Sequence, residues 1–313
     1  MNMAVSEQIS RLRAMMLIRE FEEQLSKRKD HGFQLLSSGE EGVAVGLSAA
    51  LTSEDQLLTG GRSIGPALAR GVDPDRLMAE LLGRSTGTNR GKGGRGHLAD
   101  PKSGFFGAHA VVGGNISIAA GVALSMQMDR KKGIVAILFG DGASAAGALH
   151  ETLNIATIWK LPLLFVCNNN QLSVSTPRSE ALAPRQLSDF GLAFGIPSRT
   201  IDGMDVNIVA DTMQEAVARI RAGGGPEFIE CVSYRFASHS TTARETRSPD
   251  ELAAMREHCP IVRQEAAMIA AGIIDSRGVE DLRREVVERI AQVIAFADSS
   301  PYPDKSEVLT DVW

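Results

Sequence analysis

Apolar side chains recur at intervals of three and four residues near the start of the chain. This spacing predicts an amphipathic helix from Glu7 to about Asp30 that buries one face, and its apolar positions are Ile9, Leu12, Met16, Leu17, Phe21 and Leu25. A second apolar stretch, Val43 to Leu51, predicts another helix, and Gln56 to Thr59 predicts a short strand. Asp73-Pro74 is typical of a helix start with proline in the first turn.

Strand-like and helical patterns alternate through the middle of the chain. Such alternation predicts an α/β fold, a doubly wound and mostly parallel sheet with helices on both faces. The predicted strands are Gly133 to Phe139, Leu161 to Cys167, Ile196 to Ile201 and Glu227 to Tyr234, and the predicted helices are Asn115 to Met128, Ser144 to Trp159 and Val206 to Arg221.

Two further helices are predicted at the end of the chain, Asp250 to about Ala271 and Val279 to Ala297. A chain of 313 residues could form two domains, but doubly wound sheets of this size also occur as one. We expect one domain spanning residues 1–313, with a helical N-terminal extension (1–52) and a helical C-terminal tail (250–313).

Between Gly83 and Gly114 the chain is rich in glycine and has no hydrophobic periodicity, which predicts a long loop. Long loops in compact domains are usually functional, although glycine-rich segments can also be flexible linkers. Phe105, Phe106, Val111 and Val112 favour a packed loop.

Composition limits the class of protein. No apolar run approaches the ~20 residues that span a bilayer, and the segment from Met1 to Ser10 lacks an export signal. Cys167, Cys231 and Cys259 have no metal or redox spacing and suit a reducing cytoplasm, where we expect the protein to reside. A net charge of −5 without a basic stripe argues against nucleic acid as a partner.

Polar side chains follow two of the predicted strands. Gly140-Asp141-Gly142 ends one strand, and Asn168-Asn169-Asn170 ends the next. If these strands are parallel neighbours, their carboxyl ends lie only ~5 Å apart, so a carboxylate and carboxamides converge above the sheet edge. An all-oxygen ligand set with room for a phosphate favours Mg²⁺ or Ca²⁺.

Two other interpretations compete. Gly140 to Ala145 fits the dinucleotide fingerprint G-x-G-x-x-G/A, which would indicate a nicotinamide oxidoreductase. However, Asp141 would face the pyrophosphate with like charge, and the next strand ends in asparagines instead of the acidic residue that holds the ribose. Each motif alone could also be an ordinary turn.

The two motifs together resemble the thiamine diphosphate fingerprint. With Trp159-Lys160-Leu161-Pro162, the chain resembles the α subunit of the decarboxylating component of 2-oxo acid dehydrogenase complexes, nearest to the pyruvate and acetoin dehydrogenase α subunits. The resemblance runs nearly end to end. It includes Arg19 with Phe21-Glu22-Glu23, Ser38-Gly39-Glu40-Glu41, Gly104-Phe105-Phe106-Gly107, Asp202-Gly203-Met204-Asp205, Tyr234-Arg235 and Ser300-Pro301-Tyr302-Pro303-Asp304.

The resemblance implies a thiamine diphosphate-binding fold and assigns roles to individual residues. Asp141, Asn170 and the Leu172 carbonyl would be ligands of Mg²⁺. Gly142 and Ala143 would lie against the diphosphate, as would amides at the start of the helix from Ser144, and Arg62 would pair with it. Ala110, Val112 and Gly113 would line the aminopyrimidine, and His239 would be the catalytic histidine that reaches the cofactor from a loop. The other histidines have no metal-ligand spacing and are left structural or unassigned, and His109 is the first candidate among them for a functional role.

The resemblance also implies an oxidoreductase that decarboxylates or cleaves a 2-oxo acid or acyloin and passes the acyl group to a lipoyl-bearing acyltransferase. The family's catalytic glutamate resides on a separate β subunit, so an α₂β₂ assembly with half of each site on this chain is expected. A carboligase subunit of a biosynthetic pathway and a non-catalytic assembly subunit are the alternatives.

Three positions depart from the family pattern. Gly61 stands where a tyrosine is common, Leu35 where a histidine is usual, and Ala243 where an aspartate often occurs. Leu35 would make the pocket less polar. We therefore hypothesise a substrate other than plain pyruvate, such as a bulkier 2-oxo acid or an acyloin, or a dedicated biosynthetic carboligation.

Overall fold

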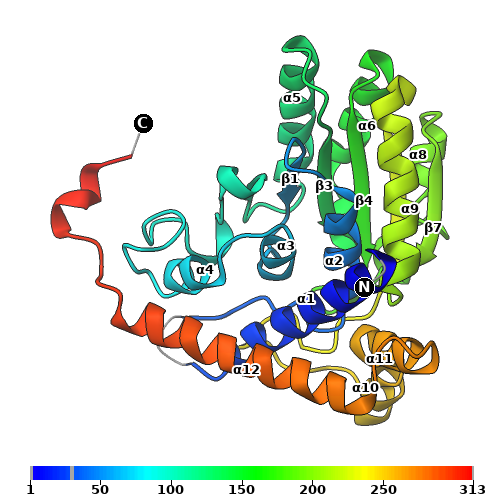
Figure 1. The fold of residues 1–313 in the computed structure, drawn as a ribbon. Coiled ribbons are helices and arrows are strands. Elements are labelled where there is room, and N and C mark those ends of the chain that lie inside the picture. The colour runs from blue at the N-terminus through cyan, green and yellow to red at the C-terminus, as the bar shows by residue number, and fades with distance from the viewer. Residues whose placement is uncertain (1–2, 29–31, 312–313) are drawn as a thin grey trace.

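The computed structural model describes residues 3–28 and 32–311 and is built around one six-stranded sheet (Figure 1). Every strand pair in this sheet is parallel, as predicted. The order is β2 (Phe105–Ala108), β1 (Gln56–Thr59), β3 (Val135–Gly140), β4 (Leu163–Asn169), β8 (Glu227–Val232) and β7 (Ser198–Asp202).

Helices cover both faces of the sheet because side chains alternate in direction along each strand. On β3, Ala136 and Leu138 belong to one hydrophobic cluster, whereas Val135 and Ile137 belong to the other. The first cluster is shared with α1 (Met3–Ser26), α2 (Glu41–Ala50), α3 (Ile64–Ala69), α4 (Pro74–Leu81), α9 (Val206–Arg219) and α12 (Ser276–Ser299). The second is shared with α5 (Gly114–Met128) and α6 (Gly147–Trp159), and α8 (Asp189–Ala193) packs at its edge.

The remaining elements are short or lie at the periphery. A two-stranded antiparallel sheet joins β5 (Leu172–Ser173) to β6 (Thr176–Pro177), and α7 (Arg178–Ala181) follows it. α10 (Pro249–Arg256) and α11 (Pro260–Ala270) precede α12, which packs along α1 and α4 (Figure 1).

Most predicted elements are confirmed, including the helix start at Asp73, whose side chain accepts a hydrogen bond from the Asp75 amide. The first helix ends at Ser26, and Asp30 lies outside the described residues.

Three predictions of local structure were wrong. The segment 83–114 is not entirely loop, because Phe105–Ala108 forms the edge strand β2. Pro260 divides the helix expected over 250–271 into α10 and α11, since proline cannot continue a preceding helix. The helix expected from Ser144 begins at Gly147, after a 3₁₀ turn over Asp141–Ala145. In addition, five short elements were not predicted: α3, α7, α8, β5 and β6.

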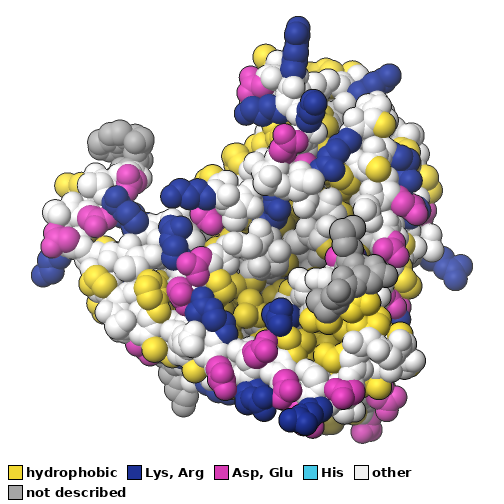
Figure 2. Space-filling view, viewed as in Figure 1, with side chains coloured by type: hydrophobic (Ala, Val, Ile, Leu, Met, Phe, Trp, Pro, Cys, Tyr) yellow, Lys and Arg dark blue, Asp and Glu magenta, His cyan; other side chains and the backbone are white. Residues whose placement is uncertain are grey.

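Acidic and basic side chains are interspersed over the face shown in Figure 2, and neither sign forms a continuous patch there. Within residues 3–28 and 32–311, no helix is both long enough and apolar enough to cross a bilayer.

Candidate active site

The sheet register brings the two strand-end motifs together. β3 and β4 are adjacent, with Gly140 opposite Asn168, so Asp141 and Asn170 leave the sheet at the same edge. A cleft of about 620 Å³ opens there. It is lined by all ten residues singled out from the sequence: Arg62, Ala110, Val112, Gly113, Asp141, Gly142, Ala143, Asn170, Leu172 and His239.

Asp141 is almost fully buried, and its Oδ2 atom has no hydrogen-bond partner among the described residues. Burial raises the pKa of Asp141 to about 6; the Gly142 amide opposes this shift, and the nearby charge of Glu40 adds to it. A buried acceptor without a donor is rare in proteins and calls for an explanation such as a bound ion. The cleft therefore offers a free carboxylate oxygen at the end of β3.

The orientation of the Asn170 amide is fixed by two contacts. Its Nδ2 donates to Glu40 Oε1, and its Oδ1 accepts a hydrogen bond of 3.1 Å from the Leu172 amide. Because only the nitrogen can donate to the carboxylate, these contacts identify the oxygen, which keeps a second lone pair. Glu40 is thus a site residue to which sequence reasoning gave no role, although it lies in the Ser38 to Glu41 segment.

Arg62 connects three segments of the site. Its Nη atoms donate to the backbone carbonyls of Leu36 and His239, and its Nε lies 3.5 Å from Glu40 Oε2. Arg62 also lines a smaller cavity of about 80 Å³ that adjoins the cleft and includes Glu40 and Asn170. The arginine therefore holds the His239 loop while it contributes a positive charge to the cleft.

Gly61 and Leu35, two of the departures from the family pattern, lie next to each other. A Cβ atom at Gly61 would lie 3.4 Å from Leu35 Cδ1, which is ordinary contact, so Leu35 occupies the space beside the missing side chain. Both residues line the cleft, together with the half-exposed Phe33.

His239 lies in the loop after β8, at the same sheet edge as Asp141. Burial, followed by the positive charges of Arg62 and Arg235, lowers its pKa below the usual value. The imidazole is therefore neutral at neutral pH and can both donate and accept a hydrogen bond.

Arg235 is a buried cation that sequence reasoning noted only within a family segment. Its side chain is 1% exposed, and its Nε and Nη1 atoms have no partner among the described residues. Burial lowers its pKa to about 10, which still leaves it charged. No local sequence pattern separates such an arginine from a surface one, because its burial arises from tertiary packing.

The turn that carries Ala110, Val112 and Gly113 is held by His109, whose Nδ1 accepts a hydrogen bond of 3.0 Å from the Val111 amide. The His109 ring also meets His97 edge to face. Gly113 has a φ of +76°, and a Cβ there would lie 2.9 Å from Ala146 Cβ, so a larger residue would displace the turn. His109 therefore supports the cleft wall.

The segment after β3 was expected to present amides from a helix at Ser144. The amides of Gly142 and Ala143 belong instead to the 3₁₀ turn, and the α-helix begins later. A Cβ at Gly142 would lie 2.4 Å from Ser173 Oγ, so a larger residue there would have to displace the Ser173 side chain.

The described residues contain no cluster of three or more histidine, cysteine, aspartate or glutamate side chains suited to a metal ion. A cation in this cleft would therefore depend on the mixed set of Asp141, the Asn170 amide and backbone carbonyls. Such all-oxygen sets suit hard cations like Mg²⁺.

Comparison with known proteins assigns the family. A family model described as "Dehydrogenase E1 component" matches residues 10–306. The chain belongs to the dehydrogenase E1 component family. It is accordingly an oxidoreductase subunit, and enzymes of this family generally depend on thiamine diphosphate.

Relatives of this E1 chain are α subunits. It is 38% identical over 283 residues to the α subunit of acetoin:2,6-dichlorophenolindophenol oxidoreductase of Bacillus subtilis (strain 168), covering 90% of this chain and 85% of the relative. It is also 38% identical over 306 residues to the pyruvate dehydrogenase E1 component α subunit of Rhizobium meliloti (strain 1021), covering 96% and 88%. The chain is therefore of the E1 α type.

Proposed function

We propose that this chain is the α subunit of a thiamine diphosphate- and Mg²⁺-dependent dehydrogenase that acts on a 2-oxo acid or on acetoin. The observation that carries the proposal is Oδ2 of buried Asp141, which has no hydrogen-bond partner within residues 3–28 and 32–311 and lies in one cleft with Asn170, Arg62 and His239. When bound, thiamine diphosphate would supply the nucleophilic carbon that permits cleavage of a bond beside a carbonyl.

Asp141 and Asn170 would hold the metal ion, with the Leu172 carbonyl as a third ligand. The donor set supports this role because it is all oxygen and includes one free carboxylate oxygen. A cation would also relieve the repulsion between Asp141 and Glu40 that contributes to the raised pKa of Asp141.

The diphosphate would lie against Gly142 and Ala143, where the absence of large side chains lets it approach the backbone amides. Arg62 would face it with a positive charge, and Ala110, Val112 and Gly113 would line the aminopyrimidine. His239, neutral at physiological pH, could donate or accept a proton at a bound substrate.

A separate β subunit would complete the site in an α₂β₂ assembly. Among the described residues, the carboxylates that line the cleft and its adjoining cavity are Asp141, the proposed metal ligand, and Glu40, which accepts a hydrogen bond from Asn170. The catalytic glutamate would come from the β subunit, as the family resemblance implies. Val111 and Val112 are 61% and 69% exposed beside the cleft, which supports coverage by a partner. The acyl product would pass to a lipoyl-bearing acyltransferase.

The substrate would be bulkier or less polar than pyruvate. Phe33, Leu35 and Val174 give the cleft apolar walls, and Leu35 fills the position beside Gly61. An apolar wall binds an aliphatic substituent by removing it from water, at about 0.8 kcal/mol per methylene.

Turnover of pyruvate, a branched 2-oxo acid and acetoin by the purified chain with its β partner tests this function, with an artificial dye as electron acceptor. We expect activity only when both chains are present, and kcat/KM higher for the branched acid or acetoin than for pyruvate. A Leu35→His variant should lower that preference. Activity of the chain alone would contradict the shared site, and a clear preference for pyruvate would contradict the substrate assignment.

A further inference from the structure

Glu80, on α4, is a fully buried carboxylate outside the cleft. It accepts four backbone hydrogen bonds from a single glycine-rich loop. Oε2 accepts from the amides of Asn89 and Gly91, each at 2.8 Å, and Oε1 accepts from those of Gly93 and Gly94, at 2.8 and 2.9 Å. One side chain therefore fixes the path of residues 89–94.

The glycines of this loop serve close packing rather than flexibility. A Cβ atom at Gly87 would lie 2.4 Å from Glu80 Oε2, and one at Gly91 would lie 2.6 Å from the Gly83 carbonyl carbon. Gly91 also has a φ of +78°, which L-residues rarely adopt. The loop closes around the carboxylate because these positions carry no side chain.

The same loop forms one wall of the cleft. Gly93, Gly94, Arg95 and Gly96 line it. The Arg95 guanidinium lies 3.8 Å from the ring centroid of Phe33 on the opposite segment, and a Cβ at Gly96 would lie 3.3 Å from Ala110 Cβ. Glu80 contacts the loop residues immediately before Arg95, so it acts on the cleft through the backbone.

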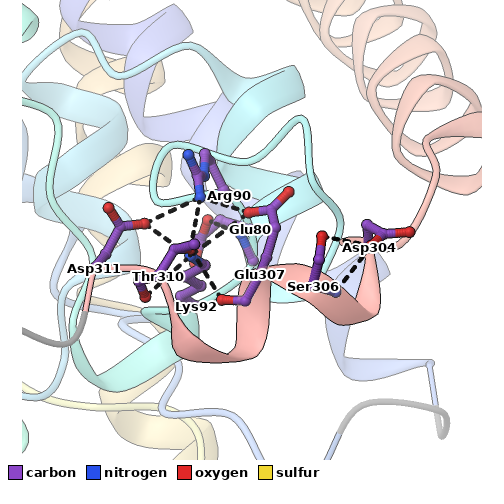
Figure 3. A network of polar contacts seen from close by, with 9 residues as sticks. Glu80, Arg90, Lys92, Asp304, Ser306, Glu307, Thr310 and Asp311 are labelled. Carbon is purple, nitrogen blue, oxygen red and sulfur yellow. Dashed lines mark hydrogen bonds and ion pairs between the residues drawn. The ribbon is translucent and has the colours of Figure 1, made fainter.

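A second set of contacts reaches the loop from the C-terminal segment Asp304–Asp311 (Figure 3). Arg90 pairs with Glu307 and Asp311, and Lys92 pairs with the same two carboxylates. These side chains are partly exposed, with Asp311 at 63% and Arg90 at 49%. Exposed ion pairs contribute little, whereas a buried carboxylate with four amide donors leaves all four unsatisfied when it is lost.

We propose that Glu80 is a positioning residue that holds the Gly93–Gly96 wall of the cleft in the shape that binds the cofactor, with the C-terminal segment contributing only a minor clamp. The cofactor's identity rests on the proposed function, but the hold of Glu80 on the loop does not.

The test uses the Glu80→Gln variant of the full chain assembled with its β partner. Glutamine keeps the shape, but its NH₂ group would face two amide N–H donors. We expect tryptic cleavage after Arg90, Lys92 and Arg95 to become at least about tenfold faster, and the Kd for thiamine diphosphate in the presence of Mg²⁺ to rise about tenfold or more. Because Glu80 does not touch the cleft, kcat at saturating cofactor should change by less than about threefold.

Gly87→Ala provides a second arm that keeps the carboxylate but pushes the loop away from it, because a Cβ there would lie 2.4 Å from Glu80 Oε2 and 2.6 Å from the Glu80 Cα of α4. It should change both readouts in the same direction. The control is Glu307→Gln combined with Asp311→Asn, which should alter either readout by less than about threefold.

A lower melting temperature of Glu80→Gln with an unchanged Kd and unchanged loop cleavage would overturn the inference and leave Glu80 a purely structural residue. If the wild-type assembly binds no thiamine diphosphate, the proposed function fails. Loop cleavage then decides alone whether Glu80 holds the wall.

Discussion

Three buried carboxylates in this chain have different surroundings. Glu80 accepts four amide hydrogen bonds, Glu22 accepts two hydrogen bonds from Ser37, and one oxygen of Asp141 has no hydrogen-bond partner in the part of the chain that the structure describes. Burial penalises an ionised carboxylate unless donors or a cation compensate it. Backbone donors satisfy both oxygens of Glu80, whereas Oδ2 of Asp141, in the cleft, has no donor among the described residues. A bound ligand best explains this difference.

Glu22 should make the stability of the chain depend on pH. Burial raises its pKa to about 8, while the bonds from Ser37 oppose the shift. Since the folded-state pKa is above the unfolded value, the protonated form is favoured on folding. The protonated Glu22 carboxyl stabilises the folded state fully below the ordinary pKa near 4.5, and this stabilisation is lost as the pH rises through about 8.

We therefore expect Glu22→Gln to resemble the wild type at pH 5 and to be more stable at pH 8, by a free energy of unfolding on the order of 2–4 kcal/mol. Urea unfolding of the chain at several pH values measures this difference. Glu23→Gln, at the exposed neighbouring position, should follow the wild-type curve. If the free energy of unfolding depends on pH equally for Glu22→Gln and wild type, Glu22 does not have the raised pKa assigned to it.

At the scale of elements, α2 and α9 approach closely at Gly46. A Cβ there would lie 2.6 Å from Val209 Cγ1 and 3.0 Å from the Ala210 nitrogen. The absence of a side chain at Gly46 thus allows α2 and α9 to pack closely. Gly121, on α5, has no atom within 4 Å of its Cβ position and is exposed.

These two helical glycines should respond oppositely to alanine. Gly46→Ala should lose about 1–3 kcal/mol of stability through overpacking, whereas Gly121→Ala should gain about 0.5–1 kcal/mol through helix propensity. Urea unfolding of both variants compares them directly. A Gly46→Ala chain as stable as the wild type would show that the interface yields easily.

Hydrophobic periodicity predicted the elements that are long or fully buried, because their burial pattern repeats along the sequence. It failed for α3, a helix of six residues that contains Pro66, and for the four-residue edge strand β2. β2 is an edge strand with the sequence Phe-Phe-Gly-Ala. It has no alternation of apolar and polar residues and no β-branched side chain that would mark it as a strand.

At the scale of the whole molecule, the topology explains why the site could be anticipated. Parallel strands bring their carboxyl ends to one edge, so Asp141 and Asn170 could be placed together from sequence order alone. Glu40, Arg235 and Glu80 could not be assigned in this way. The role of Glu40 depends on a contact between segments far apart in the sequence, with Asn170, and the role of Glu80 depends on the folded path of the loop 89–94, which no periodic pattern marks.

The match to the family model covers residues 10–306, and the cleft lies within it. In the proposed function, cofactor binding depends most on Asp141, the proposed metal ligand.

The most direct measurement is calorimetric titration of thiamine diphosphate into the chain assembled with its β partner, with and without Mg²⁺. Wild type should bind only when Mg²⁺ is present, and Asp141→Ala should bind more than about 100-fold more weakly. Asp211→Ala, at an exposed position on α9, should bind like the wild type. Undiminished binding by Asp141→Ala would contradict the account.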